Sequence, residues 1–221
     1  MVPHSFADRI QSLLDALPSD RSDDIGEQAR WFLRTPLELA MKLPKQMPIQ
    51  PDPSTCPNCG RPCDEKLSPY CDAHCRESSS LVRQFRAAVL TGAALMPDKQ
   101  IAFAQTAWNL MGGGLPYRNS LIPTKVLQQF LAKQGGQCGA CGGAATTVDH
   151  IKTFCNRPIN LRPMCESCAV TRPFGHPDVI TQSQSIMKDL AQRIGNDLPI
   201  RCCDDQSTWD WRAFLRLRHA P

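Results

Sequence analysis

The 221-residue sequence lacks any long apolar run. A helix that crosses a bilayer needs about 20 consecutive apolar residues, so the sequence excludes a spanning helix and predicts no membrane partner. Residues 1–20 also lack the basic start and the unbroken apolar segment of a secretion signal, because acidic residues interrupt their apolar pattern. We therefore expect a cytoplasmic protein in a reducing compartment.

Cysteine, in contrast, is abundant, with twelve residues in the chain. In a reducing cytosol such a number favours metal ligation over disulfides. The sequence shows no internal repeat apart from two groups of these cysteines. Apolar residues make up 42% of the chain, which is enough for at least one ordinary core.

The net charge of +4 is too small to predict nucleic-acid binding by itself. Its distribution is uneven, because basic residues gather in the range 124–176. That range holds Lys125, Lys133, Lys152, Arg157, Arg162 and Arg172 against Asp149 and Glu166. A solvated basic surface with no ligand explains the same excess, so both interpretations stay open.

Helical periodicity and turn residues divide the chain into six parts. Helices are expected at 5–17, 24–34, 36–43, about 79–90, about 97–111, about 123–134, about 177–194 and about 207–218. The predicted parts are a helical region (1–43), a proline-rich linker (44–54), a zinc ribbon (55–76), a helical connector (77–136), a second cysteine-rich module (137–176) and C-terminal helices (177–221). The predicted fold class is mainly α, with small zinc-bound α+β modules that hold the few short strands.

The first group of cysteines has the spacing of a closed zinc site. Two pairs, separated by eleven residues, supply the four soft ligands that a tetrahedral zinc ion requires. These ligands are Cys56, Cys59, Cys71 and Cys75, with Cys63 and His74 as possible substitutes. The pattern "CPNCGRPC…YCDAHCR" resembles the small treble-clef zinc ribbons of bacterial proteins. A site closed by four thiolates offers no open position, so we expect a structural zinc that folds the segment.

The second group encloses a polar motif between its two pairs. Cys138 and Cys141 are separated from Cys165 and Cys168 by 23 residues, again a four-thiolate pattern for a structural zinc. The β-prone stretch "TTVDHI" lies between the pairs, and Asn160 follows it. We therefore expect the zinc to tie a hairpin that carries an Asp-His pair to a following helix.

The order Cys-x-x-Cys, Asp-His-Ile, Asn-Leu-Arg-Pro-Met-Cys-x-x-Cys resembles the HNH endonuclease family, whose fold is the ββα-metal motif. The resemblance covers about residues 124–176, and "GGGLPYR" ahead of it is similar to larger bacterial HNH proteins that carry an upstream zinc ribbon. It implies that His150 is the general base, that Asp149 binds one catalytic Mg or Mn ion, and that Asn160 orders the loop. Lys152, Arg157, Arg162 and Arg172 would then contact DNA phosphates. Taken singly, each residue also has an ordinary interpretation, such as a hydrogen-bonded surface pair or a turn cap.

One position departs from the family pattern. The residue after the last cysteine is usually His or Asn and is the second ligand of the catalytic cation, whereas this chain has Ala169. Either the module is a degenerate nuclease kept for binding, or alanine is an inactivating structural substitution, or a nearby group such as His176 compensates. A proline and a glycine before His176 make the last explanation the least favoured. The sequence therefore predicts a DNA endonuclease of uncertain activity, with a non-catalytic nucleic-acid or protein-binding factor as the alternative. The N-terminal helices are candidates for docking a protein partner.

Overall fold

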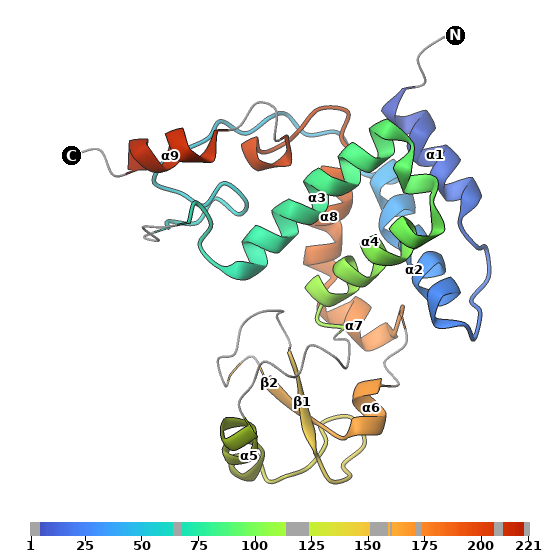
Figure 1. The fold of residues 1–221 in the computed structure, drawn as a ribbon, viewed down its shortest axis with the longest axis vertical. Coiled ribbons are helices and arrows are strands. Elements are labelled where there is room, and N and C mark those ends of the chain that lie inside the picture. The colour runs from blue at the N-terminus through green and yellow to red at the C-terminus, as the bar shows by residue number, and fades with distance from the viewer. Residues whose placement is uncertain are drawn as a thin grey trace. The chain divides into compact units, whose positions relative to one another are not determined.

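The computed structural model describes residues 5–63, 68–113, 124–150, 159, 161–170, 174–205 and 210–218. These residues form a mainly helical fold with one small two-stranded sheet (Figure 1). The chain divides into two compact units, one made of Met1–Ala104 and Ser185–Pro221 and the other of Gln105–Gln184. In the described part of the chain, no helix combines the length and the apolar character needed to cross a membrane.

The first unit is built from helices. They are α1 (Phe6–Ala16), α2 (Ile25–Lys42), α3 (Ala73–Thr91), the 3-10 turn η1 (Ala93–Leu95), the start of α4 (Pro97–Leu110), α8 (Gln184–Gly195), the 3-10 turn η4 (Cys202–Asp204) and α9 (Trp211–Arg218). The second unit contains the end of α4, α5 (Thr124–Lys133), β1 (Thr147–His150), β2 (Leu161–Met164), α6 (Glu166–Val170) and α7 (Pro177–Gln182).

Helix α1 follows directly from its sequence. Ser5 caps its start, because the Ser5 hydroxyl accepts from the Asp8 amide at 3.1 Å and the Asp8 carboxylate accepts from the Ser5 amide at 2.8 Å. Ile10, Leu13 and Leu14 form its buried face. The helix packs against α2 and α3, and its predicted position is confirmed.

Helix α2 corrects the prediction of two helices on either side of Pro36. The structure has one continuous helix with Pro36 inside it. A proline in a helix interior costs about 3 kcal/mol through a lost hydrogen bond and a ring clash. Here Pro36 lies on the buried face between Phe32, Leu33, Leu37 and Ala40. Burial of this face on both sides of Pro36 offsets the cost.

The C-terminal prediction also needs a correction. The single helix expected over residues 177–194 is interrupted at Ser183, whose φ of −114° and ψ of 17° end α7 before α8 begins. The Ser183 hydroxyl donates to the Val179 carbonyl and the Ser183 amide bonds the same oxygen at 3.0 Å. These two bonds satisfy the end of α7 and allow the break.

Two buried arginines fix the C-terminal part of the first unit. Arg193 of α8 is 1% exposed and forms an ion pair with Asp204 of η4, which is buried as well. Arg86 of α3 donates to the carbonyls that end α8, including Asn196 O at 2.5 Å and Arg193 O at 3.1 Å. Arginine thus satisfies helix-end carbonyls that would otherwise lack donors.

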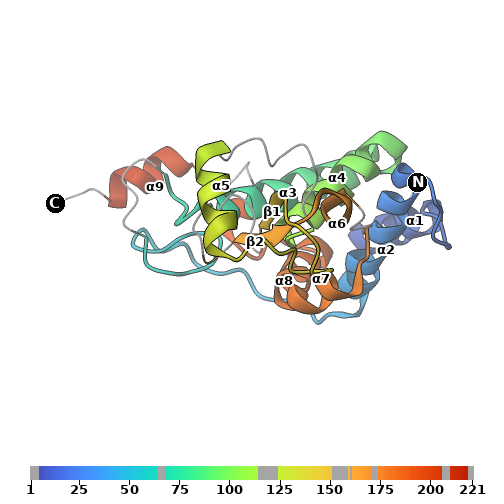
Figure 2. The same ribbon diagram turned by 90° about the horizontal axis from the view of Figure 1, so that it is seen from below.

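The second unit is organised around a short hairpin. Strands β1 and β2 are antiparallel, with Thr147 opposite Met164 and His150 opposite Leu161. Helix α5 lies against this hairpin through Phe130, which packs with Val148 and Leu161 (Figures 1 and 2). The hairpin therefore has a small apolar core of its own.

Candidate metal centres

Each cysteine cluster begins with the same tight turn. In the first, the Cys56 amide donates to Arg61 O at 2.7 Å and the Gly60 amide donates to Cys56 O at 2.8 Å. In the second, the Cys138 amide donates to Gly143 O at 2.7 Å and the Gly142 amide donates to Cys138 O at 2.9 Å. The repeated geometry directs both cysteines of each pair toward one point.

A glycine follows each of these Cys-x-x-Cys turns because of its backbone. Gly60 has a φ of 72° and Gly142 a φ of 73°, in the left-handed region that glycine adopts without steric cost. The second pair of each cluster lies at the start of a helix. Cys71 precedes α3 and Cys75 lies in its first turn, and Cys165 and Cys168 have the same positions relative to α6.

The sulfur positions fit zinc. Within each cluster the four sulfur atoms lie within 4.8 Å of one another, in the sets Cys56, Cys59, Cys71, Cys75 and Cys138, Cys141, Cys165, Cys168. Measured separations are 3.6 Å for Cys59–Cys71 and 3.8 Å for Cys141–Cys165. A tetrahedral ion with Zn–S bonds of about 2.3 Å places its ligands about 3.8 Å apart. Disulfide sulfurs would be about 2.05 Å apart, so both clusters have metal-site geometry.

Hydrogen bonds lower the pKa of one thiol in the first cluster, Cys56, and of two thiols in the second, Cys138 and Cys165. A hydrogen bond from the Cys75 thiol lowers the pKa of Cys56 to about 4, against the effect of burial. Burial raises the pKa of Cys138, but three backbone amides outweigh it and bring the pKa to about 6. The remaining thiols lose their protons when the metal binds, so zinc affinity should fall in acid.

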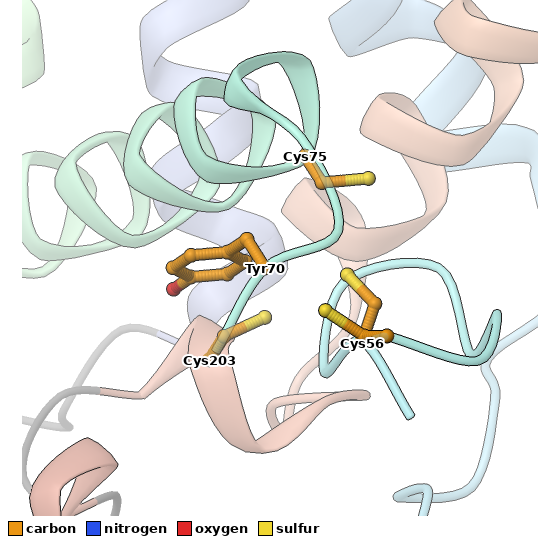
Figure 3. Close-up of a cluster of buried hydrophobic side chains, with 5 residues drawn as sticks. Cys56, Tyr70, Cys75 and Cys203 are labelled. Carbon is orange, nitrogen blue, oxygen red and sulfur yellow. The ribbon is translucent and has the colours of Figure 1, made fainter. Parts of the chain in front are cut away.

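The surroundings of the first cluster were not visible in the sequence. Arg61 donates to the Cys59 sulfur at 3.3 Å and to the Cys71 sulfur at 3.4 Å, which offsets the negative charge of four thiolates. Cys203 is buried beside Cys56 and Tyr70 (Figure 3). Burial raises the pKa of Cys203 to about 12, so this thiol stays neutral and packs as an apolar side chain.

The Asp-His pair lies at the end of β1. In the β1–β2 register Asp149 is opposite Arg162, and His150 is opposite Leu161. The Thr146 amide donates to Met164 O at 2.9 Å, which ties the start of β1 to the residue before Cys165. The backbone positions of the pair are therefore set by the second cluster. The predicted DNA-contact residues Lys152, Arg157 and Arg172, and the predicted Asn160, lie outside the described residues.

Two other predicted positions belong to the helices that follow. Ala169 is part of α6, between Cys168 and the end of that helix. His176 caps α7, where its Nδ1 accepts from the Asp178 amide at 3.3 Å. Arg162 is half-buried, and its side chain lies close to Gly139, where a Cβ atom would come within 3.0 Å of it.

Comparisons with protein-family models, with curated proteins and with solved structures found no match to this chain. The two four-cysteine clusters and the small sheet beside the second one are therefore the features that characterise it.

Proposed function

We propose that the chain is an HNH-type endonuclease that hydrolyses DNA phosphodiester bonds. One observation carries the proposal: β1, β2 and α6 follow one another around the second cysteine cluster, with Asp149 and His150 on β1. This order of two strands and a helix around a metal cluster is that of the ββα-metal motif that the sequence resembles.

Within this proposal His150 is the general base. It takes a proton from the water whose oxygen forms the new bond to phosphorus, while the P–O bond to the leaving oxygen breaks and that oxygen takes a proton from solvent. A positioned base of this kind contributes about 100- to 10,000-fold to a rate. A zinc ion in the second cluster would hold the hairpin, in which Arg162 is the register partner of Asp149.

The donor set for a catalytic Mg or Mn ion is incomplete. Asp149 offers a carboxylate, but alanine at position 169 has no donor atom. Such ions are held by one or two carboxylates with several waters, so Asp149 alone fits weak binding. We therefore assign no catalytic step to the ion in this chain.

The same alanine favours a second candidate function. A module that keeps its zinc and its basic residues but lacks a cation ligand suits a non-catalytic factor that binds nucleic acid or protein. Phosphate contacts from lysine and arginine position a protein on DNA without reading its sequence.

The decisive experiment restores the ligand. Ala169→Asn, Ala169→Ser and the parent chain are incubated with supercoiled plasmid in metal-free buffer and then with added Mg²⁺ or Mn²⁺. We expect cation-dependent nicking that is faster in Ala169→Asn than in Ala169→Ser, the control of matched polarity. Adding His150→Ala to Ala169→Asn should remove that gain.

Zinc content is measured in every variant, so that loss of fold is not mistaken for loss of chemistry. If all chains retain zinc and none nicks DNA, the endonuclease proposal is wrong. DNA binding by these inert chains would then support the non-catalytic factor.

A further inference from the structure

The last residue of helix α9 reaches into the segments that surround the first cysteine cluster. All three nitrogens of the Arg218 guanidinium donate there. The acceptors are Pro53 O at 2.7 Å, Thr55 O at 3.0 Å, Ser68 O at 3.1 Å, Pro69 O at 3.2 Å and the Cys63 sulfur at 3.3 Å. We call these five acceptors the Arg218 site.

The acceptors come from two segments that the cluster joins. Thr55 directly precedes Cys56, and Pro69 lies two residues before Cys71. Because Cys56 and Cys71 are ligands of one candidate zinc site, metal binding fixes the distance between these segments. Backbone bonds hold part of the site without the metal, because the Cys63 amide donates to Ser54 O at 3.2 Å. The metal adds the link between this segment and the one that leads to Cys71.

The geometry of the acceptors suits one chemical group. Carbonyl oxygens and a sulfur accept hydrogen bonds, and all three nitrogens of the Arg218 guanidinium, which carry five N–H donors in a rigid fork, donate to them. A lysine ammonium has three donors on a point charge and could not serve all five. The site therefore selects arginine.

We propose that the first zinc module is a guanidinium receptor, occupied in this chain by Arg218, and that zinc binding and docking of α9 are coupled through it. The inference does not depend on the nuclease proposal. Coupling between two sites is reciprocal, so zinc strengthens helix docking by the same factor as the docked helix strengthens zinc binding.

Helix α9 is short. It spans eight residues, Trp211–Arg218, and isolated helices shorter than about 12 residues are marginal in water. Phe214 is buried, and the Arg218 guanidinium lies 5.2 Å from the centre of its ring. The side chains of Arg212 and Arg216 are exposed. Docking of Phe214 and Arg218 therefore keeps the helix folded, with the charges of Arg212 and Arg216 exposed to solvent.

The first test uses the unmodified full-length chain. Zinc is withdrawn stepwise with a chelator, and cysteine alkylation mapped by mass spectrometry shows which cluster has opened at each step. Hydrogen exchange of the α9 amides is followed in the same samples. We expect α9 to lose protection in step with alkylation of the first cluster. If α9 stays protected after the first cluster has opened, the coupling does not exist.

The second test uses variants on the same helix. Arg218→Ala and Arg218→Lys should lower the zinc affinity of the first cluster about 5- to 150-fold, the usual range of coupling between two sites. Arg216→Ala removes an arginine that is 77% exposed and whose 4.0 Å pair with Asp210 is exposed as well, so the zinc affinity of the first cluster should change little. The second cluster serves as an internal control, because its zinc affinity should be the same in all chains.

Guanidinium ion provides a direct probe of the site. Added to Arg218→Ala at millimolar concentration, far below the molar range in which it unfolds proteins, it should restore part of the zinc affinity of the first cluster. The same ion should have no effect on Arg216→Ala, and urea should have none on either variant. Unchanged zinc affinity in Arg218→Ala, or equal effects of urea and guanidinium, would overturn the proposal.

Discussion

The buried ion pair between Arg193 and Asp204 offers a quantitative test of how the first unit is stabilised. The Arg193 side chain is 1% exposed and that of Asp204 is 0% exposed. Arg193 also donates to Asn58 Oδ1 at 2.5 Å, in the turn between Cys56 and Cys59. Burial alone would lower the pKa of Arg193, but the Asp204 charge outweighs it and raises the pKa. The guanidinium is therefore charged at every physiological pH.

The substitution Arg193→Ala leaves the Asp204 carboxylate buried without its counter-charge. Breaking a buried pair in this way costs about 3–5 kcal/mol, a large part of the roughly 5–15 kcal/mol that stabilises a folded domain. For a chain of this length, 1 kcal/mol lowers the melting temperature by about 2–4 °C. We therefore expect Arg193→Ala to melt about 6–20 °C below the parent chain.

The assay is thermal unfolding followed by circular dichroism, with both zinc sites loaded. Arg201→Ala is the matched control, because Arg201 pairs with Asp189 at 2.8 Å but both side chains are partly exposed, at 20% and 36%. Such a pair contributes about 0–1 kcal/mol. Arg201→Ala should therefore melt within a few degrees of the parent chain.

A double variant separates the effect of the unpaired charge from the effect of the lost side-chain volume. Arg193→Met with Asp204→Val removes both charges and keeps a similar total volume, a replacement that is often neutral or stabilising. It should recover most of the loss, although the Asn58 amide oxygen stays without its donor. The reasoning is refuted if Arg193→Ala melts like Arg201→Ala, or if the double variant is less stable than Arg193→Ala.

Three further changes test other parts of the structure. Gly113→Ala should lower the melting temperature, because a Cβ atom there overlaps the Trp108 ring. Cys141→Ser should reduce bound zinc from two ions to one per chain by elemental analysis, whereas Cys203→Ser should leave two. At the start of α9 the amides of Ala213 and Arg212 donate to the Asp210 carboxylate and lower its pKa. This cap stabilises the helix above the unfolded pKa of about 3.9 and is lost as pH falls through the lower folded pKa. Asp210→Asn should weaken this pH dependence of α9 protection in hydrogen exchange.

The local elements could be predicted because their signals are local. Ile10, Leu13 and Leu14 repeat at helical spacing, and a serine cap precedes them, so α1 was predicted almost to its ends. The two Cys-x-x-Cys-Gly turns were equally clear, since a thiolate pair followed by glycine has few other structures. Pro36 misled the prediction because its cost is offset by a buried face that only the packed helices create.

The long-range contacts had no such signal. Arg218 bonds carbonyls about 150–165 residues earlier in the chain, and a carbonyl is present at every position, so nothing in the sequence marks the acceptors. Arg193 and Asp204 are eleven residues apart, outside the i, i+4 spacing that pairs charges along a helix. Cys203 carries no sequence signal for a related reason, because only the fold places it beside Cys56.

The two clusters share one turn geometry but differ in what surrounds them, and this difference bears on their roles. Two arginines connect the first cluster to the rest of its unit, Arg193 through Asn58 and Arg218 through the adjoining carbonyls. A third, Arg61, lies in the loop of the cluster itself and donates to two of its ligand sulfurs. In the second, Cys141 is exposed, and the strands that the cluster joins carry the Asp-His pair. A closed four-thiolate site stabilises whatever its ligands connect. The first zinc should therefore control the helical unit, and the second the hairpin on which any chemistry depends.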